Sequence, residues 1–289
     1  MRPYPLLLEI ALKICKIFAC LIPHQNLRQK LRRFPFVCFH RLHLMAKRNN
    51  AKNTIKANVF ISAGNACKPA LHLRNYGLRK LSCPFDWIMN YDLREFYRCF
   101  EVEFSDFFAN CYEAGDKTNN TQGKERWVVS ASNAGAISIH AFPKSMSLES
   151  YLPTFREKMQ KRFNRLKRKI LDSTSVAFVC VRTDSLEDLA DFGKKFITLC
   201  ESWQICQLQN ASDKNERERE RESKIRVIII NVRHKEKIPK TSITKQIHNI
   251  DENVSIVEFI CNDTSINPKQ HYLGNTYAWH KIMLQLQLA

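Results

Sequence analysis

Three apolar runs decide the fold of this chain: Val176–Val181 (VAFVCV), Arg226–Val232 (RVIIINV) and Val254–Ile260 (VSIVEFI). Each run is rich in β-branched residues and does not alternate strictly with polar ones, which is typical of a strand covered on both faces. The segment 185–203, between the first two runs, has the pattern of a helix. Because strand, helix and strand in this order favour a right-handed crossover, we predict a three-layer α/β fold with a mostly parallel, Rossmann-like sheet.

The chain before these runs adds further strands and helices. An apolar run over 57–63 precedes Gly64, and the segment 67–76 that follows is predicted to be a helix. Between 148 and 170, apolar residues recur every three or four positions, which predicts one face of a long helix. The other face of that helix is basic, and it is either solvated or binds anions. Three more predicted elements are a helix that opens at Asp92, adjacent strands at 127–130 and 136–142, and a closing helix at 275–287.

The composition excludes several function classes. Glycine contributes only 7 of the 289 residues, and neither G-x-x-x-x-G-K-[ST] nor G-x-G-x-x-G occurs, so common glycine-loop nucleotide sites are excluded. The formal net charge of +18 favours an anionic partner. Because no RNA-recognition, zinc-finger or helix-turn-helix pattern accompanies this charge, we do not expect nucleic-acid binding. The 11 cysteines include no C-x-x-C pair, so we expect free thiols in a reducing compartment, with no metal and no cofactor.

Residues 1–50 form a strongly basic segment, with ten Lys and Arg residues and a single acidic residue, Glu9. The apolar stretch between Pro5 and Pro23 is marginal in length for a membrane span and contains charges, which favours an amphipathic helix in the membrane interface. A helix packed on the protein core and a spanning helix are the alternatives. We expect residues 1–50 to be a leader that binds an anionic membrane surface, with the protein cytoplasmic and peripheral on the inner face of the membrane.

The remaining residues, 51–289, are predicted to be a single α/β domain. A charged run within 210–224, with the sequence ERERERE, separates the predicted helix from the strand that follows. Neither a helix nor a strand would pair its charges well, so we predict an exposed insertion at this place.

Three short motifs carry a resemblance to a known family. They are S-x-G-x-x-C (Ser62, Gly64, Cys67), L-R-x-x-G-L-R (Leu73, Arg74, Gly77, Leu78, Arg79) and S-x-P-F-D-W (Ser82, Pro84, Phe85, Asp86, Trp87). With weaker echoes as far as Gly274 and Trp279, the chain resembles a bacterial family of papain-like cysteine peptidases over residues 57–285. The first 50 residues lie outside this resemblance. They are similar to the basic leaders of capsule and lipopolysaccharide glycosyltransferases in some Gram-negative bacteria.

The resemblance implies a thiol-dependent hydrolase, and the predicted elements give its residues a physical rationale. Cys67 stands at a predicted helix N-terminus, where the helix dipole is expected to lower the thiol pKa and favour the nucleophilic thiolate. His140 is the expected base, in the Cys-then-His order of papain-like enzymes, and Asp86 is the expected orienting or proton-handling carboxylate. Each has a plainer alternative: a packed thiol, a histidine bonded to backbone, and a carboxylate that holds a turn.

A second expectation concerns the ligand. In an open parallel sheet, ligands bind outside the carboxyl ends of the strands, where the segments 64–67 and 182–184 are expected to meet. Arginines at this edge suit an anionic ligand such as a phosphate or a nucleotide-sugar. The expected substrate-binding residues are Arg74, Arg79, Arg182 and Asp184.

Three function classes therefore compete. The leading one is a thiol-dependent hydrolase with Cys67 as its nucleophile. The second is a sugar or phosphoryl transferase of capsule or lipopolysaccharide assembly, which would bind an anionic donor without covalent catalysis. The third is a basic adaptor that binds a membrane or nucleic acid without catalysis. A papain-like fold has a helical half and a barrel-like half, so an antiparallel barrel would overturn the predicted parallel sheet.

Overall fold

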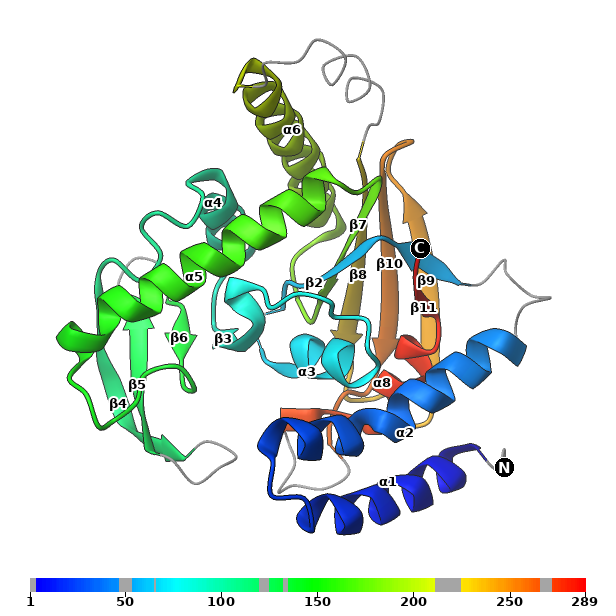
Figure 1. The fold of residues 1–289 in the computed structure, drawn as a ribbon. Coiled ribbons are helices and arrows are strands. Elements are labelled where there is room, and N and C mark those ends of the chain that lie inside the picture. The colour runs from blue at the N-terminus through cyan, green and yellow to red at the C-terminus, as the bar shows by residue number, and fades with distance from the viewer. Residues whose placement is uncertain are drawn as a thin grey trace.

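The computed structural model describes residues 4–46, 54–64, 66–119, 125–131, 135–210, 225–265 and 272–289. Its centre is a five-stranded sheet in the order β2 (Val59–Ser62), β7 (Ser175–Cys180), β8 (Arg226–His234), β10 (Val254–Cys261) and β9 (Ile243–Asn249) (Figure 1). β2, β7, β8 and β10 run parallel, and β9 is antiparallel to β10. The predicted α/β fold with a mostly parallel sheet is confirmed, and this central sheet is not the barrel of a papain-like architecture.

Alternate side chains of the central strands build one hydrophobic core on each face of the sheet. On one face, Phe178 and its neighbours pack under the helices α4 (Leu93–Glu101), α5 (Leu148–Leu171) and α6 (Leu186–Asn210). On the other face, Ala177 and Val179 lie against α3 (Lys68–Asn75) and α8 (Thr276–Met283). Every residue of β7 is buried, which explains why its sequence is apolar without alternation.

The predicted helices begin and end at the residues that cap them. The side chain of Ser147 accepts a bond from the backbone N–H of Ser150 at 3.3 Å at the start of α5. Asp92 does the same for Glu95 at 2.6 Å at the start of α4. α3 ends before Gly77, whose φ of 72° lies in the left-handed region that glycine adopts at low cost. The charged run predicted within 210–224 follows α6, and residues 211–224 lie outside the described residues.

Two smaller sheets complete the architecture. β3 (Ile88–Met89), β6 (Ile137–Ser138), β5 (Glu125–Ala131) and β4 (Cys111–Asn119) form an antiparallel sheet in that order. Its β5–β6 pair confirms the predicted adjacent strands at 127–130 and 136–142. The second sheet pairs β1 (Ile55–Ala57) with β11 (Leu286–Leu288) in parallel.

The closing helix is shorter than predicted. α8 ends at Met283, and the prediction of a helix over 275–287 is wrong for its last residues. Leu286 is fully buried in the core that α3 and α8 share, and its strand supplies backbone partners to Ile55–Ala57. Tertiary packing against β1 therefore overrides the local helical pattern at the chain end.

Two further helices precede the α/β body. α1 (Tyr4–Cys20) packs on α2 (Gln25–Ala46), and α2 lies between α1 and the body (Figure 1). The ring of Phe36 in α2 lies 5.3 Å from that of Tyr76, and the Nε2 atom of the buried His40 lies 2.7 Å from the carbonyl oxygen of Leu286. α2 is therefore docked on the body. No helix within the described ranges combines the length and hydropathy that a bilayer crossing needs.

Candidate functional site

The turn between β2 and α3 places Cys67 at the edge of the central sheet. A Cβ atom on Gly64 would lie 2.9 Å from the Cγ atom of Pro69 and 3.2 Å from the backbone nitrogen of Val181, so the chain passes too closely here for a side chain. Cys67 follows and is the N-cap residue of α3, with φ −72° and ψ −12°. The S-x-G-x-x-C motif therefore encodes a close approach of β2 to β7 and the entry into a helix.

The Cys67 thiol is a protonated group in the resting protein. Burial, and secondly the negative charge of Asp86, raise the pKa of Cys67 to about 11. The expectation that the helix N-terminus lowers this pKa is therefore wrong. α3 has only 8 residues, and the favourable interaction of a thiolate with its dipole is smaller than the cost of removing that thiolate from water.

Asp86 is the buried carboxylate of the site. It lies in the short 3-10 helix η2 (Pro84–Trp87), where Oδ2 accepts bonds from the Arg79 guanidinium and, at 2.9 Å, from the backbone N–H of Cys83. Its second oxygen, Oδ1, is buried without a hydrogen-bond partner. Burial raises the pKa of Asp86 to about 6, although the positive charges of Arg79 and Arg162 act in the opposite direction. One carboxylate oxygen of Asp86 is thus buried without a partner, and the charge of this carboxylate acts on the Cys67 thiol.

Trp87, the next residue, contacts three of the other predicted residues, Arg74, Arg79 and His140. The guanidinium carbons of Arg74 and Arg79 lie 5.0 and 5.7 Å from its ring centroids, within the range of cation–π attraction. The His140 ring meets Trp87 edge-on, with centroids 6.2 Å apart. Burial and the charge of Arg126 lower the pKa of His140, so this imidazole is neutral near pH 7. Arginines of the L-R-x-x-G-L-R motif and the predicted histidine therefore meet at the tryptophan of the S-x-P-F-D-W motif.

Positive charge dominates this neighbourhood. Burial, Arg79 and Arg33 together lower the pKa of Arg74 to about 10, and the Nε atom of Arg74 is buried without a hydrogen-bond partner. The pKa of Arg33, from α2, is lowered by burial and by the charge of Arg79. Arg162, from α5, has its pKa lowered by burial while Asp86 attracts it. We refer to Arg33, Arg74, Arg79 and Arg162 as the arginine cluster.

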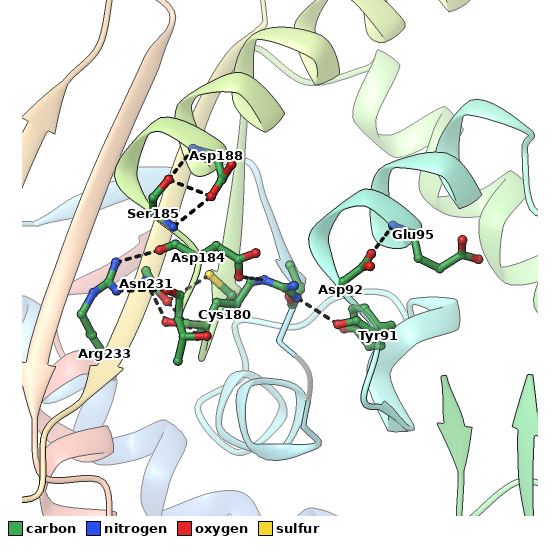
Figure 2. Close-up of polar contacts among 12 residues, drawn as sticks. Tyr91, Asp92, Glu95, Cys180, Asp184, Ser185, Asp188, Asn231 and Arg233 are labelled. Atoms are coloured by element: carbon green, nitrogen blue, oxygen red, sulfur yellow. Dashed lines mark hydrogen bonds and ion pairs between the residues drawn. The ribbon is translucent and has the colours of Figure 1, made fainter. Parts of the chain in front are cut away.

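Arg182 and Asp184 lie in a separate network at the end of β7. The Nε atom of Arg182 donates to Asp184 at 2.7 Å, and its Nη1 atom lies 3.4 Å from the carbonyl oxygens of Ala63 and Tyr91. Figure 2 shows this region, where Arg233 donates at 3.0 Å to the backbone carbonyl oxygen of Asp184. The Arg182 side chain is almost fully buried and its contacts are internal, so it ties the ends of β2 and β7 together.

The C-terminal part of the chain fixes the helix that Cys67 opens. Lys68 forms a 2.7 Å ion pair with Asp263, whose other oxygen accepts the indole N–H of Trp279 at 2.9 Å. The His72 ring stacks on Trp279 with centroids 4.5 Å apart. Gly274 has a φ of 62°, and a Cβ atom there would lie 2.2 Å from the Oδ1 atom of Asp263. These contacts explain the G-x-x-x-x-W pattern near the chain end.

Sequence reasoning missed two members of the arginine cluster. Arg33 lies in the basic leader, and Arg162 is one of several residues on the predicted basic face of the 148–170 helix. Neither segment carries a signal that singles out one arginine among its neighbours. In the part of the chain that the structure describes, no three His, Cys, Asp or Glu residues gather as a metal site would require.

Comparison with known proteins gives one family. The sequence profile of a family described as "putative papain-like cysteine peptidase" matches residues 58–235, which is more than half of the chain and includes Cys67, Asp86 and His140. Searches of curated proteins and of solved structures give no match. The matched segment contains all three sequence motifs and covers more than half of the chain, which therefore belongs to this family.

Proposed function

We propose that the chain is a thiol-dependent hydrolase of an anionic substrate. The observation that carries the proposal is that the charge of Asp86 acts on the Cys67 thiol, while Asp86 itself accepts a bond from Arg79. Arg79 belongs to an arginine cluster that holds more positive charge than this one buried carboxylate neutralises. The buried, unpartnered Nε atom of Arg74 supports a role in binding an anionic group of the substrate. Membership of a cysteine peptidase family supports the thiol as the reacting group.

The reaction that fits these residues is acyl transfer through a thioester. The Cys67 Sγ atom attacks the substrate carbonyl carbon while its proton passes to a neighbouring base, and the leaving group departs with a proton. Water then hydrolyses the thioester, which releases the acid and restores the thiol. Because a thiol with a pKa of about 11 is protonated at neutral pH, proton removal has to accompany the attack.

Two residues compete for the role of the base. Asp86 has a pKa of about 6, and it is the residue whose charge acts on the thiol. His140 is neutral near pH 7, and its ring contacts Trp87, the residue that follows Asp86. We assign the first proton transfer to Asp86 and keep His140 as the alternative base. Asp86→Asn slows formation of the thioester under this assignment, and His140→Ala slows it under the alternative.

An activated ester with a free carboxylate, such as p-nitrophenyl hemisuccinate, tests the proposal. We expect release of p-nitrophenol, an acyl adduct on the Cys67 peptide by mass spectrometry, and loss of both in Cys67→Ala. We also expect the rate to exceed that with neutral p-nitrophenyl acetate, and this preference to disappear in Arg74→Gln but not in Arg32→Gln, an exposed arginine outside the cluster. Ester cleavage that survives Cys67→Ala would refute the nucleophile role.

The raised pKa of Cys67 favours one other function, a transferase that binds an anionic donor without covalent catalysis. The same experiment separates the two. The transferase alternative predicts no adduct on Cys67, together with binding of an anion such as inorganic pyrophosphate that Arg74→Gln weakens and Cys67→Ala leaves unchanged.

A further inference from the structure

The two N-terminal helices expose an unusual amount of apolar surface. Eight large apolar side chains between Ile10 and Leu42 are exposed, whereas the rest of the described chain exposes five. Soluble proteins leave single apolar side chains exposed without consequence, but a concentration on one element marks an interaction surface. The question is which partner fits this surface.

The exposed large apolar residues of α1, together with Leu21 directly after its end, lie on one helical face. Ile10, Ile14, Ile17 and Leu21 follow each other at spacings of four, three and four, and their side chains are between 45% and 76% exposed. We call these four residues the apolar stripe. Phe18, which is also exposed, lies beside Ile14 and Leu21 on the same face. α1 packs on α2, and Figure 1 shows α1 on the outer side of α2, away from the central sheet.

α2 also exposes apolar side chains, while its other face holds the body. Leu27, Phe34 and Leu42 are each more than half exposed, and their spacing of seven and eight residues places them on one face of the helix. Phe36 and His40, which contact the body, fall on the opposite face. α2 is thus fixed to the body on one side and exposes apolar side chains on the other.

Charge complementarity identifies the partner. Lys13, Lys16, Lys30 and Arg32 are exposed on the same two helices, and Glu9 is the one acidic residue among the first 50. Lys13 follows Ile10 by one helical turn and flanks the apolar stripe, where a long side chain reaches from an apolar layer to charged headgroups. An apolar face bordered by lysines is the pattern of a helix that lies in the interface of an anionic bilayer.

We propose that α1 and α2 dock the protein on an anionic membrane surface, with the apolar stripe at the acyl boundary and the lysines at the headgroups. This docking does not depend on the proposed hydrolase activity.

Vesicle flotation of the full-length protein tests the docking. The vesicles contain phosphatidylcholine alone or with about 30% phosphatidylserine, which supplies the negative surface charge. We expect binding to the anionic vesicles. The variant Ile14→Ser/Ile17→Ser should lose at least about tenfold in apparent vesicle affinity, since it removes half of the apolar stripe. Lys13→Gln/Lys16→Gln should weaken binding to anionic vesicles and leave the neutral vesicles unaffected.

The matched control is Ile205→Ser/Ile247→Ser, which removes two equally exposed isoleucines from α6 and β9. It should bind like the wild type, and circular dichroism should show the same melting temperature for all four proteins. Equal binding of the stripe variant and the wild type overturns the proposal. A second result would also overturn it. If light scattering finds a dimer that the stripe substitutions dissociate, and vesicles bind neither the dimer nor the monomer, then a second copy of the chain covers the stripe.

Discussion

At the scale of single residues, the fold sets the charge state of Asp86. Burial raises its pKa from 3.8 to about 6, so the folded state binds the proton more tightly than the unfolded chain does. Because the folded state binds this proton more tightly, protonation of Asp86 adds to the free energy of unfolding. This contribution is complete below pH 4 and is lost as the pH rises through 6. A difference of about two between the folded and unfolded pKa values corresponds to about 3 kcal/mol of unfolding free energy, which is a large part of the usual stability of a domain.

The variant Asp86→Asn tests this pH dependence because the amide resembles the protonated acid and does not titrate. We expect the wild type to lose about 3 kcal/mol of unfolding free energy relative to the variant between pH 4 and pH 7.5. Urea denaturation at a series of pH values measures the difference. A difference between the two proteins that stays constant over this range would show that Asp86 is not buried as described.

The sequence motifs predicted a set of candidate site residues but not their electrostatics. Cys67, Asp86 and Trp87 belong to short motifs whose residue types suggested chemistry. In the structure, the charge of Asp86 acts on the Cys67 thiol, and Trp87 contacts Arg74. The direction of the Cys67 pKa shift was not predictable, because it depends on how much of the thiol the tertiary structure covers. Arg33 and Arg162 reach the site from α2 and α5, and no local pattern links those helices to the motifs.

At the scale of elements, the position of α3 depends on a contact that is remote in sequence. Asp263 binds Lys68, the first residue of α3, and also the indole of Trp279 in α8. Gly274 allows this approach because it lacks a side chain and has a φ of 62°. Asp263 therefore couples the helix that follows Cys67 to the C-terminal helix.

We expect Gly274→Ala to destabilise the protein by about 3 kcal/mol or more. The new methyl group would collide with the Asp263 carboxylate, and alanine adopts a positive φ only at a cost. Chemical denaturation gives the loss. Gly115→Ala is the control, because a Cβ atom at Gly115 meets no atom within 4 Å. A cost for Gly274→Ala no greater than that of the control would contradict the coupling of α3 and α8.

The strands that are buried on both faces could be predicted from the sequence, because burial alone makes their sequences continuously apolar. β7, β8 and β10 are buried on both faces, so their apolar runs identified them. β9 is an edge strand with the sequence ITKQIHN, most of which is exposed, and its pairing with β10 leaves little trace in the composition. β11 was missed because its partner, β1, lies at the other end of the domain.

At the scale of the whole molecule, both ends of the chain contribute to a site whose motifs lie in the middle. The family match covers residues 58–235. Arg33 comes from before this segment and Asp263 from after it, and they reach the arginine cluster and α3, respectively. The central sheet is mostly parallel, and Cys67 lies just beyond the carboxyl end of β2, where open parallel sheets bind their ligands. The family's papain-like label thus accompanies an architecture different from that of papain.

The central claim is that Cys67 reacts next to a cluster of positive charge that attracts anions. Alkylation of Cys67 by iodoacetate and by iodoacetamide tests it most directly, because the two reagents differ chiefly in charge. The rates are measured by peptide mass mapping at about pH 9 and low ionic strength, where screening is weak. The reference is free N-acetylcysteine under the same conditions, and Cys67→Ala identifies the labelled peptide.

We predict that the ratio of the iodoacetate rate to the iodoacetamide rate is several-fold higher for Cys67 than for the free thiol. The ratio should fall in Arg74→Gln and with added salt, and it should stay unchanged in Arg32→Gln. A ratio equal to that of the free thiol, unaffected by Arg74→Gln, would contradict the account, because the arginine cluster would then not act on anions that approach Cys67.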